Sequence, residues 1–95
     1  MTTDEIPDPR ALTLTTRLAG EVVQHSSVDL LIFDVPALVV WLSRYITFQP
    51  GDLLWTGTPG GVGEARTPQR FLRAGDVLET EIEGIGTMRN PVVER

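Results

Sequence analysis

The sequence predicts an α+β fold that is mainly β, with four or five strands and one helix. Residues 12–18 and residues 77–83 alternate apolar with polar side chains, which is typical of strands with one buried face. Between them, Asp34 and Pro36 form a helix-start signal in front of an apolar stretch. No linker or low-complexity segment divides the 95 residues, so we expect one small domain at most.

A β-hairpin is expected near the start of the chain. Residues 4–9 contain two prolines and predict an extended, turn-rich entry. The strand at residues 12–18 follows, Ala19 and Gly20 provide a tight turn, and residues 21–24 begin the return strand.

The helix is predicted at about residues 35–46. Asp34 can accept hydrogen bonds from free N–H groups of the first turn, and Pro36 is favourable there because it lacks an N–H. Four large side chains recur at the spacing of one helical face: Leu38, Trp41, Leu42 and Tyr45. We therefore expect Trp41 to lie in the core.

The second half of the chain alternates predicted strands with loops. Residues 53–56 are apolar on both faces, which indicates a short strand covered from two sides. Four of the next seven residues, 57–63, are glycine, and a polar loop continues to residue 70. The strand at residues 77–83 and a last strand at residues 87–93 complete the pattern.

The glycine-rich loop is the strongest candidate for a binding site. Glycine permits positive φ and close approach, and successive backbone N–H groups can form a concave anion site. Thr56 and Thr58 add hydroxyl donors, so a carboxylate or an enolate oxygen is the expected guest. The spacing matches neither a phosphate-binding P-loop nor a dinucleotide fingerprint. Its composition alone is also compatible with a simple turn.

Composition excludes several classes of function. The net charge is −5, all eight cationic residues are arginine, and they form no cluster, so we expect no nucleic-acid binding. The chain has no lysine for Schiff-base chemistry and no cysteine for disulfides, thiolate metal sites or nucleophilic attack. The absence of cysteine fits a cytoplasmic protein, and the polar, acidic N-terminus resembles neither a signal peptide nor a transit peptide. The longest apolar stretch, residues 37–42, is too short to span a membrane.

Two further groups of residues are weaker candidates. His25 is the only histidine, and nothing in the sequence designates an acid partner for a catalytic triad, so we expect a surface or hydrogen-bonded histidine. Glu79, Glu81 and Glu83 share one strand face and could hold a cation. A solvated face is the interpretation we favour for them.

Several motifs also follow one another in a specific order. They are TDEIPDP (3–9), GEVVQ (20–24), LIFDVP (31–36), LSR (42–44), PGDLLWTGTPGGVG (50–63), LRAGDV (72–77) and EIEGIGTMRN (81–90). In order and spacing they resemble the C-terminal part of the catalytic domain of the fumarylacetoacetate hydrolase family, also called fumarylacetoacetase-like. The resemblance covers nearly the whole chain.

The resemblance implies a mixed β-roll or sandwich of the fumarylacetoacetase C-terminal-domain type, here incomplete. Residues 1–95 would be the C-terminal portion of a single catalytic domain, without its upstream metal-binding half. Enzymes of this family hydrolyse carbon–carbon bonds, decarboxylate or isomerise keto-acids, diketo-acids and hydroxy-dienoates. The implied cofactor is Mg²⁺ or Mn²⁺, and the implied partners are a small keto-acid and either a homo-oligomer or a complementing upstream half.

The resemblance also implies which residues take part. Thr58 and Gly57 match the family's substrate-binding positions, while no catalytic or metal-binding residue is carried over. The family's metal acids, a Glu-x-Glu pair and an aspartate, precede the first motif, and Glu81 and Glu83 have that spacing at the wrong place. The family's catalytic lysine has no counterpart, and Val28-Asp29-Leu30 replaces a Thr-x-Asp pattern.

We therefore expect the chain alone to be inactive and to hold no Mg²⁺. Two alternatives stay open: a non-catalytic anion-binding module and one half of a split enzyme.

Overall fold

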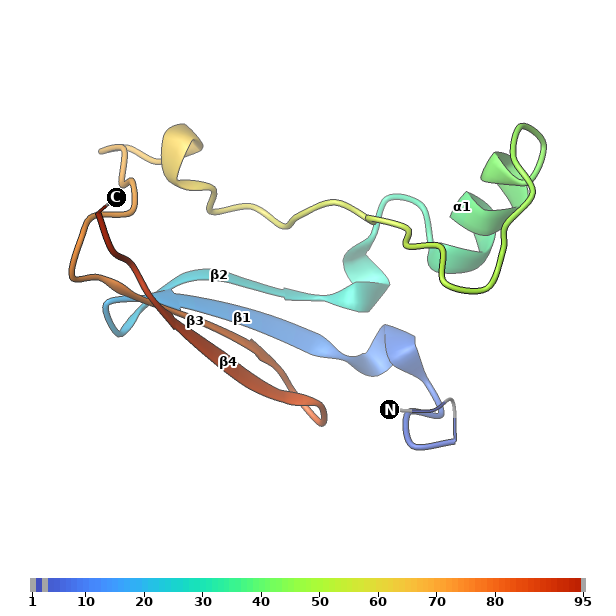
Figure 1. Ribbon diagram of the computed structural model, residues 1–95, viewed down its shortest axis with the longest axis horizontal. Coiled ribbons are helices and arrows are strands. Elements are labelled where there is room, and N and C mark those ends of the chain that lie inside the picture. Colours follow the sequence, from blue (N-terminus) through green and yellow to red (C-terminus); the bar gives the residue numbers. More distant parts are fainter. Residues whose placement is uncertain (1, 3, 95) are drawn as a thin grey trace.

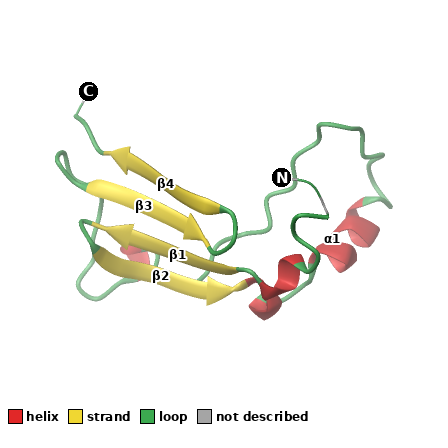
Figure 2. Ribbon diagram, turned by 90° about the horizontal axis from the view of Figure 1, so that it is seen from below, coloured by secondary structure: helices red, strands yellow, loops and turns green. Residues whose placement is uncertain are grey.

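The computed structural model describes residues 2 and 4–94, and its main feature is a four-stranded antiparallel sheet (Figures 1 and 2). The strands are β1 (Thr13–Leu18), β2 (Glu21–Ser27), β3 (Val77–Ile82) and β4 (Gly86–Pro91), in the order β2-β1-β3-β4. One α-helix, α1 (Val35–Leu42), and three short 3₁₀ turns complete the described chain. The predicted α+β, mainly β class is thus confirmed, as an open sheet with one helix.

The β1–β2 hairpin forms where the sequence predicts it. Ala19 and Gly20 have φ values of 50° and 84°, as a type I′ two-residue turn requires. Leu18 pairs with Glu21 beside this turn, and β2, which begins at residues 21–24 as predicted, continues to Ser27. A bulge opposite Thr16 and Arg17 shifts the register within the pair.

The two faces of the sheet differ in chemistry because side chains alternate along each strand. One face carries the apolar residues of β1 and β3, including Leu18 and Leu78, which are register partners. The other face is polar: Arg17 pairs with Glu81 at 2.6 Å, and Arg89 pairs with Glu79 at 3.3 Å. The acidic side chains of β3 therefore face outward among arginines, as the alternating pattern predicts.

Helix α1 begins at its predicted cap but ends before residue 46. Asp34 accepts a hydrogen bond from the Ala37 N–H at 2.8 Å. At the other end, the Ser43 hydroxyl donates to the Val39 carbonyl at 2.7 Å, and the Arg44 N–H bonds to the Trp41 carbonyl in a 3₁₀-type contact. No helix in the described residues has the length and apolar character needed to cross a membrane.

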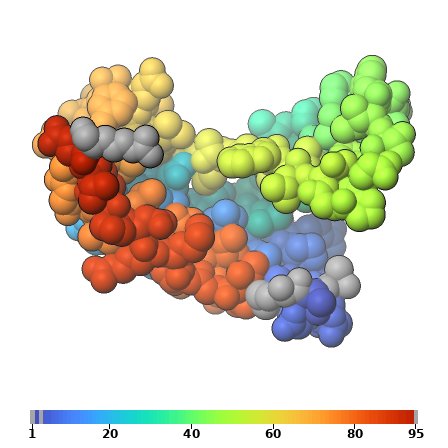
Figure 3. Space-filling model, in the orientation of Figure 1, coloured from blue at the N-terminus to red at the C-terminus, as the bar shows by residue number. Residues whose placement is uncertain are grey.

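Residues 31–57, which we call the arm, extend away from the sheet and form a lobe of their own (Figures 1 and 3). Two predictions fail here. Trp41, expected in the core, is 55% exposed, and residues 53–56 form no strand. Leu53 and Trp55 are 85% and 88% exposed because the described chain supplies neither a strand partner nor a covering layer at this position.

The chain as a whole exposes more surface than its length predicts. Its accessible area is 7797 Å², whereas a compact monomer of this size exposes about 5,400 Å². Its radius of gyration is 15.9 Å, against about 12.4 Å for a compact domain of this length. Leu18, at 5% exposure, is the one buried apolar residue among those described. Many large apolar side chains therefore remain exposed to solvent in this architecture.

Candidate functional site

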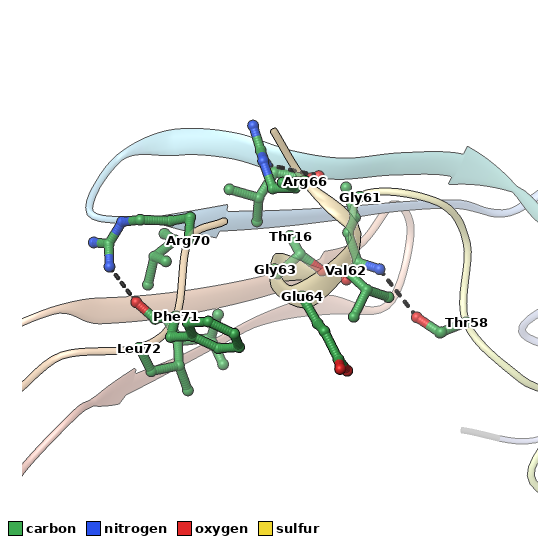
Figure 4. Close-up of a pocket in the computed structure, with 14 residues that line it drawn as sticks. Thr16, Thr58, Gly61, Val62, Gly63, Glu64, Arg66, Arg70, Phe71 and Leu72 are labelled. Carbon is green, nitrogen blue, oxygen red and sulfur yellow. Dashed lines mark hydrogen bonds between the residues drawn. The ribbon is translucent and has the colours of Figure 1, made fainter. Parts of the chain in front are cut away.

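A pocket of about 500 Å³ lies between the glycine-rich loop and the apolar face of the sheet (Figure 4). Thr16, Leu18 and Leu78 contribute its lining from β1 and β3. Phe71 and Leu72 lie at one end, and Thr58 lies at the other. The pocket thus has an apolar floor and a polar end formed by the loop.

Two glycines allow the loop to lie against its neighbours. Gly61 has a φ of 105°, and a Cβ placed on it would lie 2.0 Å from the Val23 carbonyl oxygen. A Cβ on Gly63 would lie 2.0 Å from the Arg70 carbonyl oxygen. Any side chain at these positions collides with backbone, so glycine is required for this close packing.

A side chain of β2 attaches the start of the loop to the sheet. Gln24 pairs in register with Thr16, on the pocket side of β2. Its Nε2 donates to Thr58 Oγ1 at 3.0 Å and to the Pro59 carbonyl oxygen at 2.9 Å. Gln24 is not among the residues predicted from the sequence. The signal that could have identified it is its position: it is a polar residue of β2 opposite Thr16, on the side of the sheet that carries the apolar residues of β1.

The structure separates the two residues predicted to bind substrate. Thr58 is exposed and lines the pocket. Gly57 has a φ of 101° and open space around it, and it lies beside the pocket rather than in its lining. Thr56, the other candidate hydroxyl, does not line it either. Of these three loop residues, Thr58 alone lines the pocket.

The cationic side chains at the pocket are already paired. Arg66 bonds to the Val23 carbonyl at 3.3 Å and lies 3.5 Å from Glu21. Arg70 donates to both carboxylate oxygens of Asp76, each at 2.9 Å, and also to the Phe71 carbonyl.

These bonds lower the pKa of Asp76: the Arg70 hydrogen bonds contribute most, and the Arg73 backbone N–H contributes next. Glu64 adds a negative charge to the lining. The pocket therefore has no net positive charge with which to hold an anion.

No group of three His, Cys, Asp or Glu side chains within residues 2 and 4–94 is placed to hold a metal ion. Glu79 and Glu81 are paired with arginines, and Glu83 accepts a hydrogen bond from Thr13 at 2.8 Å. The described residues do not fit a magnesium or manganese site. His25 is exposed, with its Nδ1 2.9 Å from Thr15 Oγ1.

Comparisons with known proteins place these features in context. Residues 1–93 match the family model described as fumarylacetoacetate (FAA) hydrolase C-terminal. Over 93 residues the chain is 45% identical to oxaloacetate tautomerase fahd2, mitochondrial, of Xenopus laevis, covering 98% of this chain and 29% of that protein. The chain therefore spans less than a third of that relative's length.

Solved structures show the same fold. A fumarylacetoacetate hydrolase from Exiguobacterium antarcticum superposes with a TM-score of 0.93 at 40% identity, covering all of this chain and 34% of that one. A maleylpyruvate hydrolase from Sphingobium sp. SYK-6, in complex with manganese (II) ion and pyruvate, superposes with a TM-score of 0.85 at 31% identity. That alignment covers 98% of this chain and 33% of the hydrolase.

Proposed function

The chain belongs to the fumarylacetoacetate hydrolase family, and from this premise we propose that it is the substrate-side portion of an enzyme acting on a small keto-acid, diketo-acid or hydroxy-dienoate. The reaction would be carbon–carbon bond hydrolysis, decarboxylation or isomerisation. Two relatives support this substrate class, because the names of an oxaloacetate tautomerase and a maleylpyruvate hydrolase both specify oxo-acids. Within one catalytic domain, residues 1–95 would form the C-terminal portion.

The Thr58 hydroxyl carries the proposal. It lines the pocket and accepts a hydrogen bond from Gln24, and no protein acceptor for its own proton is found among the described residues. That proton is free to be donated to a substrate carboxylate, and a hydrogen bond to a charged acceptor is stronger than a neutral one. Gly57 would add its backbone N–H at the mouth of the pocket.

A cation from outside the described residues completes the proposal. The pocket has no net positive charge, so a keto-acid anion would need an additional positive group to bind there. We propose Mg²⁺ or Mn²⁺ held by carboxylates of an upstream half, and the manganese and pyruvate of the maleylpyruvate hydrolase support this choice. Bound there, the ion would supply Lewis acidity at the keto-acid oxygens.

Those carboxylates would belong to the same polypeptide or to a second chain, so a homo-oligomer and a split enzyme are both compatible with the proposal. A stand-alone anion-binding module is less compatible, because both arginines of the lining are already paired with carboxylates, those of Glu21 and Asp76. Our proposal for the compartment is the cytoplasm, although the name of the Xenopus laevis relative specifies mitochondria.

The test is Thr58→Val in the full-length enzyme that carries this segment. Valine keeps the shape but removes the donor, so kcat/KM should fall about 10- to 150-fold, the cost of losing one hydrogen bond to a charged group. Thr58→Ser, which keeps the hydroxyl, should retain most activity. Thr56→Val is the matched control, since Thr56 does not line the pocket. An unchanged kcat/KM for Thr58→Val contradicts the proposal.

A further inference from the structure

We infer that Gln24 is a positioning residue that makes the Thr58 hydroxyl a hydrogen-bond donor toward the pocket, and so makes this end of the pocket selective for an anionic oxygen. The inference rests on the proposed function, in which Thr58 binds a substrate carboxylate. It adds a second residue, on a different strand, that decides what kind of group Thr58 recognises.

The orientation of the Gln24 amide follows from its partners. The Pro59 carbonyl oxygen, 2.9 Å from Nε2, can only accept a hydrogen bond. The amide nitrogen, and not the amide oxygen, must therefore face the loop. The same nitrogen is 3.0 Å from Thr58 Oγ1, so its two hydrogens serve one acceptor each. The neighbouring carbonyl thus resolves the usual ambiguity between an amide nitrogen and oxygen.

This assignment fixes the polarity of Thr58. A free hydroxyl donates one hydrogen bond and accepts others, so on its own it binds donors and acceptors alike. Here Gln24 already donates to the oxygen, and the hydroxyl proton has no protein acceptor in the described part of the chain. The proton is therefore available to a ligand, and an N–H donating to the same oxygen makes that O–H a stronger donor. A carboxylate oxygen can take this free proton, whereas an amide N–H would have to compete with Gln24 for the oxygen lone pairs and would leave the proton unused.

Backbone contacts hold Gln24 at the required distance from the loop. The residue before it, Val23, lies at the bulge of β2, and its carbonyl oxygen meets Gly61 with no room for a Cβ. Arg66 donates to the same carbonyl at 3.3 Å. These contacts attach the loop to β2 in addition to the Gln24 bonds, so part of the attachment remains when Gln24 is replaced, while the Gln24–Thr58 bond also orients the hydroxyl.

The test uses Gln24→Glu in the full-length enzyme. Glutamate has nearly the same shape, but its carboxylate accepts and cannot donate. Thr58 should then donate to the introduced carboxylate and present its oxygen to the pocket. The measurement is the inhibition constant of pyruvate and of its neutral amide, pyruvamide. We expect the preference for pyruvate over pyruvamide to fall about 10-fold, the effect of exchanging one hydrogen bond to a charged group. If Gln24 only contributes packing, its substitution should weaken the binding of both inhibitors equally. An unchanged ratio of the two inhibition constants would therefore contradict the inference.

The matched control is Gln69→Glu. Gln69 also donates to a loop carbonyl, that of Glu64, at 2.9 Å, but it does not contact Thr58. Its substitution introduces the same charge in the same loop region and should leave the ratio unchanged. Gln24→Ala removes the donor without adding charge and should lower the ratio in the same direction, which covers the case in which Gln24→Glu does not fold.

The Thr58→Val background separates this inference from the proposed function. If Gln24 acts through Thr58, Gln24→Glu should change the ratio little once Thr58 is valine. A normal ratio in Gln24→Glu, with a lowered ratio in Thr58→Val, overturns the inference and leaves the proposed function intact. Equal effects of Gln24→Glu in both backgrounds also overturn it. An unaltered ratio in Thr58→Val overturns both.

Discussion

The sheet and the arm differ in how completely they satisfy their own side chains. In the sheet, antiparallel ladders pair the backbone, Leu18 is buried, and Arg17 and Arg89 pair with glutamates of β3. In the arm, Ile32 is 92% exposed and Trp55 is 88% exposed, and α1 exposes Trp41 as well. An apolar pattern in the sequence therefore shows which side chains are suited to burial, but not which segment or partner buries them.

The largest effect of the difference between sheet and arm is expected in the isolated 95-residue chain. We expect it to form oligomers and to bind hydrophobic dyes, because exposed apolar patches above a few hundred Å² promote association. Replacing Trp41 and Trp55 by serine should reduce dye binding with little change in hydrogen exchange of the β1 and β3 amides. If the parent chain sediments as a compact monomer, melts sharply and binds no dye, the arm does not expose an apolar surface as described.

A second test addresses the contact between the loop and the sheet. Gly61→Ala places a Cβ against the Val23 carbonyl at an unfavourable φ of 105°, and such backbone strain costs about 1–3 kcal/mol before the collision is added. Unfolding free energy of the full-length protein should fall accordingly, and limited proteolysis should cut the loop faster.

Gly60→Ala is the control for this test. No atom lies within 4 Å of its added Cβ and its φ is not positive, so we expect a change within about 0.5 kcal/mol. Equal effects of the two substitutions would falsify the close packing of the loop on β2.

Acid should loosen the segment between the loop and β3. Hydrogen bonds from Arg70 and the Arg73 N–H lower the pKa of Asp76 below its ordinary value of 3.8. A lowered folded-state pKa means that the stabilisation is present above the unfolded value and is lost as pH falls through the folded one. The temperature of the unfolding midpoint should therefore decrease as the pH is lowered below about 4. Asp76→Asn should make this decrease smaller.

Asp29→Asn serves as the control for the acid response. Asp29 is exposed and makes no ion pair in the part of the chain that the structure describes. Its substitution should leave the acid limb of the stability curve unaltered. An Asp76→Asn protein with the parent's pH dependence shows that the Arg70–Asp76 pair does not contribute.

The smallest effect concerns the hairpin turn. Ala19 has a φ of 50°, a left-handed conformation that costs about 1–2 kcal/mol for a residue with a Cβ. Ala19→Gly should raise the unfolding free energy of the full-length protein, by about 0.5–1 kcal/mol once the greater freedom of glycine in the unfolded chain is subtracted. Ala74→Gly, at an exposed turn residue without positive φ, should be destabilising instead.

The sequence predicts the sheet well because alternation is a local signal. The type I′ turn, β1 and β3 need only neighbouring residues to be recognised. Residues 53–56 were predicted as a strand because they are apolar on both faces, but a strand also requires a partner, which a local pattern does not specify. Trp41 was placed in the core for the same reason, since helical spacing defines a face without naming what packs on it.

For the candidate site, the sequence also identified the local motif but not the contacts between distant residues. The motif pointed to Thr58, which lines a pocket in the structure, and its role in substrate binding stays a prediction. Gln24 was missed because its role depends on a contact 34 residues away along the chain. The pairing of Arg70 with Asp76 has the same origin, since a charge count shows how many ions a chain has but not which ones neutralise each other.

The position of the loop also determines how the sheet can grow. Both β2 and β4 are edge strands, and an unpaired edge accepts further strands. At β2, Gly61 and the Arg66 side chain contact the Val23 carbonyl, so a strand pairing there would have to displace the glycine-rich loop. At β4 all six residues are exposed. A strand added beside β4 would therefore leave the contacts of Gly61 and Arg66 intact, whereas a strand added beside β2 would disturb them.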